Sequence, residues 1–163
     1  MIGRIFHEDS EDDDDEPELT EVGHIDGYRI IGDAEDLFFW ADSLNQDIHD
    51  AVVWLKGQDE DKVDFALLQG CLFVKEVEVA PEWRGKGFVL KAVASYIEIF
   101  AHGSLAFLKP APLVPFDDPA VQKREIEKRR RFWRKLGLNN YDSEANILWE
   151  FGWNCPEWLR GEI

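Results

Sequence analysis

The clearest alternation of apolar and polar positions along the chain lies between Cys71 and Val79. Successive side chains of a strand point to opposite faces of a sheet, so this run predicts a strand with two distinct faces. One face is expected to carry Leu72, Val74, Glu76 and Glu78, and the other Phe73, Lys75, Val77 and Val79. Pro81 has no N–H for a ladder and is expected to end the strand.

A helical pattern follows from Phe88 to about Ala101. Its polar residues form one narrow stripe on a largely apolar helix, made of Lys91, Ser95, Glu98 and, just beyond the end, His102. Residues 105–108 then read as another apolar strand. A strand, a helix and a second strand in this order predict a right-handed crossover between two neighbouring parallel strands.

The other elements are expected on both sides of this unit. Strands are predicted at residues 1–6, 37–41, 65–69 and 146–153, and a strand or hairpin at 23–31. A helix is predicted at 44–55, although residues 36–55 also fit one long helix, and a polar loop at 57–64. Asp118 as N-cap and Pro119 at the first position predict a helix that ends at Leu136 before Gly137.

The composition predicts one folded domain. A chain of 163 residues with 45% hydrophobic residues can build one substantial core but not comfortably two. Cys71 and Cys155 lack the spacing of metal ligands, so they are expected to be reduced thiols of a cytoplasmic protein. No stretch is long and apolar enough for a signal peptide or a membrane span, and no membrane association is predicted.

The net charge of −16, from 34 acidic and 18 basic residues, argues against general binding to nucleic acid or to an anionic membrane. Nine acidic residues gather near the N-terminus, namely Glu8, Asp9, Glu11, Asp12, Asp13, Asp14, Asp15, Glu16 and Glu18. Residues 1–22 are therefore predicted to be an acidic, flexible segment before a folded domain at 23–163. An alternative is that the acidic run folds over the basic helix after Pro119. The rest of the chain is still acidic, which suits an amine substrate.

The turn at residues 83–87 has features of an anion site. Gly85 and Gly87 let the backbone approach a ligand closely, and Arg84 and Lys86 bring positive charge. The turn opens a helix, whose free N–H groups and dipole attract a phosphate or pyrophosphate.

This strand, turn and helix resemble the acetyl-CoA-binding motif of the GNAT N-acetyltransferase superfamily, Arg/Gln-x-x-Gly-x-Gly/Ala. Arg84 matches its first position and Gly87 the second, and Val89 stands where Gly or Ala is usual. The resemblance implies an α/β fold with a mixed sheet, in which two parallel strands splay apart and admit the pantetheine arm. It also implies that backbone groups of Val77 and Val79 bind this arm. The pyrophosphate would contact Arg84, Gly85, Lys86, Gly87, Phe88 and Val89.

A second segment, RFWRKLGL at residues 131–138, resembles the late GNAT segment in which a tyrosine often protonates the departing CoA thiolate. Trp133 takes that position here, and an indole N–H is no practical acid. Water, Tyr141 or Tyr96 would then supply the proton. Trp133 itself is a predicted contact of the cofactor.

The resemblance predicts a direct transfer of the acetyl group from acetyl-CoA to a primary amine, carried by a small molecule or a peptide. A base must take a proton from the amine, and Glu78 and Glu76 are the candidates. His24, His49 and His102 stand singly, and no metal site is predicted. A homodimer is one assembly considered. Two alternatives are a non-catalytic CoA-binding regulatory module and an acidic interaction protein that mimics nucleic acid.

Overall fold

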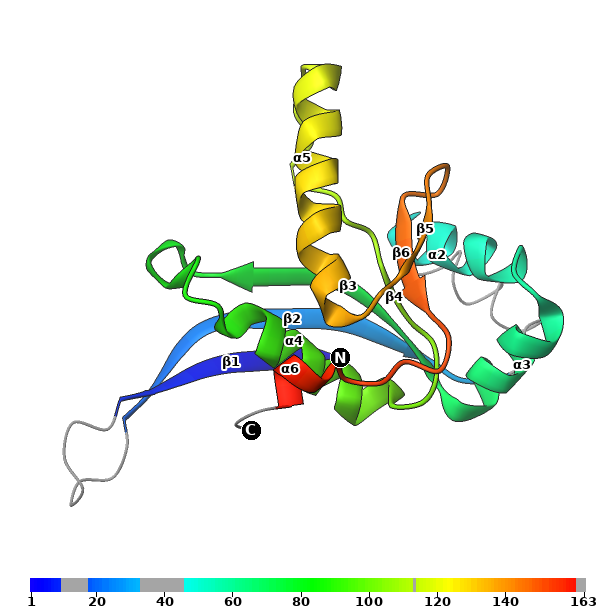
Figure 1. Ribbon diagram of the computed structural model, residues 1–163, viewed down its shortest axis with the longest axis horizontal. Coiled ribbons are helices and arrows are strands. Elements are labelled where there is room, and N and C mark those ends of the chain that lie inside the picture. The colour runs from blue at the N-terminus through cyan, green and yellow to red at the C-terminus, as the bar shows by residue number, and fades with distance from the viewer. Residues whose placement is uncertain (10–17, 33–45, 113, 161–163) are drawn as a thin grey trace.

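The computed structural model describes residues 1–9, 18–32, 46–112 and 114–160, which are organised around a six-stranded mixed sheet (Figure 1). The order in the sheet is β1-β2-β3-β4-β6-β5. The strands are β1 (Ile2–Asp9), β2 (Glu18–Ile30), β3 (Cys71–Val79), β4 (Ala106–Leu108), β5 (Asn140–Asp142) and β6 (Ile147–Glu150). Among them, β3 and β4 are parallel, as predicted, and the other neighbours are antiparallel.

Helices cover both faces of this sheet. On one face lie α4 (Phe88–Ala101) and α6 (Glu157–Arg160), whose apolar residues share a core with Leu72. On the other lie α2 (Gln46–Lys56) and α3 (Glu60–Gln69), which share a second core with Phe73. Because Leu72 and Phe73 are adjacent in β3, these two cores lie on opposite faces. We call them the α4 face and the α2 face.

The long helix α5 (Pro119–Trp133) begins as predicted, with Asp118 as N-cap and Pro119 at its first position. The Asp118 side chain accepts a hydrogen bond from Ala120 N at 2.8 Å. None of its residues is buried, and it projects beyond the sheet, with its C-terminal end nearest the strands (Figure 1). A short 3-10 turn (Arg134–Leu136) and Gly137 then end it.

The predicted loop is confirmed at residues 57–59, but the rest of it and the predicted strand at 65–69 are wrong, because residues 60–69 form α3. Asp59 caps the helix by accepting a hydrogen bond from Lys62 N at 3.2 Å. Val63, Ala66 and Leu67 recur at helical spacing and are buried against α2. The polar first turn hid this spacing from the sequence pattern. The predicted helix at 44–55 is confirmed from Gln46, while residues 44–45 and the predicted strand at 37–41 lie outside the described residues.

The N-terminal region forms a hairpin rather than a segment separate from the sheet. β1 pairs with the first part of β2, from Ile2 opposite Asp26 to Asp9 opposite Glu18. Parts of the acidic run at residues 7–9 and 18–21 are therefore strand, whereas a solvated chain was expected. Ile5, Val22 and Ile25 bury their side chains in the α4-face core, which explains why strand pairing extends into acidic sequence. Residues 10–17 lie outside the described part of the chain.

Two short elements near the C-terminus were not predicted. β5 pairs with β6 in a tight hairpin, and α6 packs Leu159 into the α4-face core. The predicted strand at 146–153 is shorter, because it ends at Glu150 and turns at Gly152, which has a φ of +65°. The chain then returns beneath α4, where Trp153 is fully buried and its indole donates to the carbonyl of Leu136 at 2.8 Å.

A β-bulge in β3 changes the faces on which its side chains lie. Asp26 is opposite Glu76 and Gly27 is opposite Val74, so Lys75 is an extra residue on β3. The alternation is therefore correct from Cys71 to Val74 and reversed beyond it. Val77 and Val79 join Leu72 and Val74 on the α4 face. The predicted face that combined Leu72 and Val74 with Glu76 and Glu78 is wrong.

Candidate functional site

The parallel strands β3 and β4 pair only over their first part. The pairing runs from Leu72 opposite Ala106 to Val74 opposite Leu108, after which β4 ends. Lys109 then forms an ion pair with Asp50 of α2 at 2.9 Å, and Pro110 has no N–H to continue a ladder. Within the described sheet, Lys75–Val79 therefore has a strand partner on the β2 side alone. We call the other side of these residues the open edge of β3.

The backbone groups of Val77 and Val79 point towards the open edge. Ala80 N donates to Val22 O at 3.0 Å, so this pair is a hydrogen-bonded pair of the antiparallel ladder. Such pairs alternate along two antiparallel strands, which makes Val79 and Val77 non-hydrogen-bonded partners of β2. Their N–H and C=O groups thus face away from β2. The carbonyl of Val79 accepts a hydrogen bond from Arg84 Nε at 2.9 Å.

The glycine turn lies between the end of β3 and the start of α4. Gly85 and Gly87 have φ values of +78° and +88°, and a Cβ built on either residue would meet no atom within 4 Å. Gly87 is the N-cap of α4 in the left-handed conformation that glycine adopts readily. Residues 84–87 are exposed, so the first N–H groups of α4 lie next to an open backbone turn.

Side chains around the turn have defined contacts. Lys86 Nζ lies 3.8 Å from the centre of the Trp83 ring, and Trp83 packs edge-on against Phe88. Val89 packs against the α4-face core. The Cβ of Val89 is thus accommodated by the core, although Gly or Ala is usual at this position of the resembling motif.

Trp133, Tyr96 and Tyr141 all pack in or against the α4-face core, but their remaining contacts differ. Trp133 packs against the α4-face core and edge-on against Phe132, with ring centroids 4.8 Å apart. The Tyr141 hydroxyl donates to Asn146 Oδ1 at 3.0 Å, and the Tyr96 hydroxyl donates to Met1 O at 2.9 Å. Burial and then Asp26 raise the pKa of Tyr96 to about 12. Tyr96 is therefore a poor proton donor, and its hydroxyl hydrogen is already committed.

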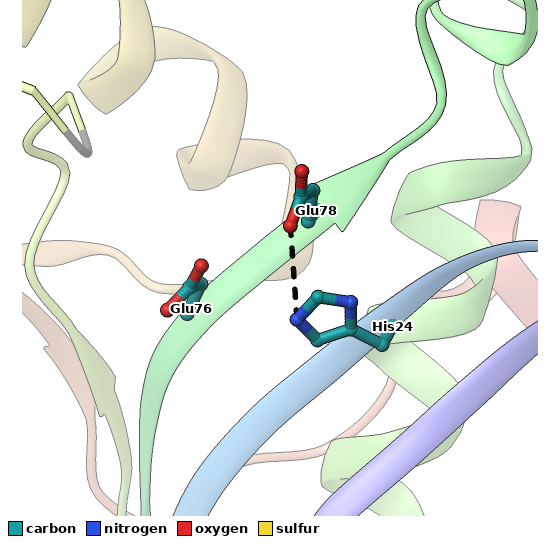
Figure 2. A group of neighbouring side chains, drawn as sticks. All are labelled: His24, Glu76 and Glu78. Atoms are coloured by element: carbon teal, nitrogen blue, oxygen red, sulfur yellow. Dashed lines mark ion pairs between the residues drawn. The ribbon is translucent and has the colours of Figure 1, made fainter.

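The register of β2 and β3 places Glu76, Glu78 and His24 on the α2 face. Figure 2 shows the three side chains, with His24 on the strand next to the one that carries both glutamates. His24 stands opposite Glu78 across β2 and β3, and its Nε2 is 3.9 Å from Glu78 Oε2. One ligand atom from each of the three residues lies within 4.8 Å of the others. Glu78 is exposed, while His24 and Glu76 are half-buried. The bulge at Lys75 produces this grouping, because it moves both glutamates to the face that His24 occupies.

Charged neighbours of this group are paired with Asp26. The Lys75 ammonium lies 3.4 Å from Asp26 Oδ2, and the N-terminal ammonium of Met1 lies 3.8 Å from Asp26 Oδ1. Partial burial opposes the charge of Lys75, but the hydrogen bond and charge of Asp26 outweigh it and raise the pKa of the lysine. Asp26 is thus neutralised locally, whereas Glu78 has the imidazole of His24 as its neighbour.

Sequence reasoning identified the two glutamates but missed His24. Each histidine stands alone in its own stretch of sequence, with no second histidine or cysteine at a metal-ligand spacing. The signal was present only as a cross-strand relation, since His24 lies 52 positions before Glu76 in the chain. Knowing the register of β2 against β3 would have revealed it.

No protein-family model, no curated protein and no solved structure matches this chain. None of the described helices has the length and apolar character needed to cross a bilayer.

Proposed function

We propose that this chain is an acyl-CoA-dependent N-acetyltransferase with a GNAT fold, acting in the cytoplasm on a primary amine. The observation that carries the proposal is the open edge of β3, whose Val77 backbone is turned away from β2 beside a parallel strand that has ended. The glycine turn and the start of α4 follow directly at its end. An extended amide-bearing arm and a pyrophosphate need this combination of an unpaired strand edge and free N–H donors.

In this proposal, acetyl-CoA lies along the open edge. The pantetheine amides pair with the backbone of Val77. The Val79 carbonyl becomes a further acceptor when the Arg84 side chain moves away and its hydrogen bond to that carbonyl breaks. The pyrophosphate sits on the glycine turn, from Arg84 to the first turn of α4, where the Lys86 ammonium is adjacent. Trp133 packs against the same core as Val77 and would border the cofactor.

The acceptor amine approaches from the α2 face, where Glu76, Glu78 and His24 lie. A primary amine is mostly protonated at neutral pH, so it must lose a proton before its lone pair can attack. Glu78, directly or through water, accepts that proton. The nitrogen attacks the thioester carbonyl and gives its second proton to water, the C–S bond breaks, and the thiolate of CoA departs. Water protonates the thiolate, because Trp133 offers no acidic group.

Binding of acetyl-CoA to the full chain, measured by isothermal titration, tests the cofactor site. The Lys86→Glu variant places a negative charge beside the proposed pyrophosphate and is expected to weaken binding by about tenfold or more, since a repulsive contact replaces an attractive one. Lys62→Glu is the matched control, because it makes the same charge change at an exposed position of α3 on the other face. Equal binding by both variants, or no binding by the native chain, would reject the proposal.

A non-catalytic CoA-binding module is the second candidate, and Trp133 in place of a tyrosine favours it. The two candidates differ in turnover. Release of CoA thiol in the presence of an amine panel, lost in Glu78→Gln but not in Glu98→Gln, supports the enzyme. Tight acetyl-CoA binding without thiol release from any amine supports the module.

A further inference from the structure

We propose that His24, Glu76 and Glu78 form a binding site for a divalent transition-metal cation, for which Zn²⁺ is the probe. The group offers one imidazole nitrogen and two carboxylate oxygens. This site uses neither the open edge nor the glycine turn of the acyl-CoA proposal, but it shares Glu76 and Glu78 with the proposed acceptor side, so a bound metal would occupy the proposed base.

The backbone holds the three residues in a metal-binding arrangement. Glu76 and Glu78 are two positions apart on one strand and therefore lie on the same face. His24 lies directly opposite Glu78. By the alternation described above, these two residues form a hydrogen-bonded pair of the antiparallel ladder, in which their backbones bond to each other. Two donors around a tetrahedral Zn²⁺ are about 3.4 Å apart, given metal–ligand distances of about 2.1 Å. The separation of 3.9 Å between His24 Nε2 and Glu78 Oε2 closes to this value with small side-chain rotations.

Glycine at position 23 brings the strands close enough for this pairing. A Cβ at Gly23 would lie 2.3 Å from the carbonyl oxygen of Glu78, so any side chain there would push β2 away from β3. The absence of a side chain thus keeps His24 and Glu78 in register. The site depends on a local feature of the sequence as well as on the topology.

The charge around the group also favours a cation. The ion pairs found in the described part of the chain join no lysine or arginine to Glu76 or Glu78. Lys75 and the Met1 ammonium form ion pairs with Asp26, and the charge of Glu76 also attracts Lys75. The three carboxylates of Asp26, Glu76 and Glu78 outnumber these two ammonium groups, which leaves a local excess of negative charge for a divalent ion to balance.

The donor set selects the kind of metal. An imidazole nitrogen with two carboxylates suits Zn²⁺ and its neighbours, whereas Ca²⁺ and Mg²⁺ prefer oxygen ligands alone. Three protein ligands leave a fourth position for water or an amine. The cysteines do not compete, since both are buried and burial raises the pKa of Cys71 to about 12.

The test is to measure Zn²⁺ binding by the full chain in a titration against a competing chromophoric chelator. Native protein is expected to bind one Zn²⁺ more tightly than any variant of this group. His24→Ala, Glu76→Gln and Glu78→Gln are each expected to lower the Zn²⁺ affinity by about tenfold or more. Loss of a residue that only orients a metal ligand already costs about tenfold, and loss of a ligand itself should cost at least as much. Mg²⁺ at equal concentration should not displace the metal.

His102→Ala is the matched control. His102 Nδ1 lies 2.9 Å from Glu98 Oε1, a closer histidine–glutamate pair that has no third ligand among the described residues, and removal of the imidazole should leave the affinity unchanged. Glu78 is exposed, so Glu78→Gln tests the site even if a change at His24 impairs folding. Zn²⁺ binding that survives all three substitutions, or that is absent from the native chain, overturns the proposal. Neither result depends on acetyl-CoA.

Discussion

At the residue scale, environment decides which polar groups are available for chemistry. Glu98 and His102 form a close pair on α4, yet one carboxylate oxygen of Glu98 is buried without a hydrogen-bond partner. His24 and Glu78 are farther apart but share their face with Glu76. Both pairs consist of one histidine and one glutamate, so residue type alone does not distinguish them. The presence of Glu76 beside His24 and Glu78 does.

Tyr96 gives a pH-dependent prediction at this scale. Its folded pKa, raised to about 12 mainly by burial, exceeds the ordinary value near 10 in the unfolded chain. The unfolded state therefore releases its proton first as pH rises, and the stability that Tyr96 contributes is complete below about pH 10 and falls between about pH 10 and 12. Urea unfolding across this range should show the decline.

Tyr96→Phe provides the comparison for that experiment. It removes the hydrogen bond to Met1 O and should cost about 1 kcal/mol of unfolding free energy at neutral pH. The difference in unfolding free energy between the native protein and Tyr96→Phe should become smaller as pH rises above about 10. A gap that stays constant through this range would show that Tyr96 does not titrate differently in the folded state.

At the element scale, one irregularity in β3 and one in β4 create the candidate site. The bulge at Lys75 reverses the faces of the last residues of β3, and the early end of β4 leaves their other edge open. Regular strands of the same composition would have put Glu76 and Glu78 beside Leu72 and Val74 on the α4 face. Periodicity predicts regular strands, so it predicted that arrangement.

Gly23→Ala tests the importance of the close approach between β2 and β3. The new Cβ would lie 2.3 Å from Glu78 O, and the strands must separate to relieve the clash. We expect a loss of about 1–3 kcal/mol in unfolding free energy, the usual cost of overpacking. Chemical denaturation measures it.

Gly57→Ala is the control for this substitution. Its Cβ would meet its nearest neighbour, Trp54 O, at 3.3 Å in a surface turn, and the expected change is within about 0.5 kcal/mol. Equal stability of the Gly23 and Gly57 variants would mean that β2 and β3 do not need this contact. The close approach at Gly23 would then not be what holds His24 opposite Glu78.

At the scale of the whole molecule, the chain carries many more acidic than basic residues. A net charge of −16 on 163 residues makes self-repulsion a long-range cost of the compact state. The acidic hairpin formed by β1 and β2 extends from the sheet, away from α2 and α3 (Figure 1). This arrangement separates its charges from the opposite end of the molecule.

Salt should therefore stabilise the protein. Raising NaCl from about 0.01 to about 0.15 M shortens the Debye length from about 30 to about 8 Å, which screens repulsion between distant carboxylates. Thermal unfolding should shift to higher temperature over this interval. Sucrose, which does not screen charge, is the control for general solvent effects, and a fall in the unfolding temperature with NaCl would show that ion pairs outweigh the repulsion.

The sequence by itself determined the elements with strong local signals. The alternation up to Val74, the apolar periodicity of α4, the Asp118–Pro119 helix start and the order that makes β3 and β4 parallel all depend on residues close together in the chain. The identification of α3 failed where a capped but polar first turn hid the helical spacing. The glycine turn was recognised because its backbone requirements are also local.

Only the tertiary structure decided how distant segments meet. The register of β2 on β3 placed His24 opposite Glu78, the bulge at Lys75 chose the face, and the end of β4 opened the edge at Val77. Each depends on pairing between strands that are far apart in sequence. A shift of one residue in such pairing exchanges the two faces of a strand, and no local pattern of hydrophobicity records it.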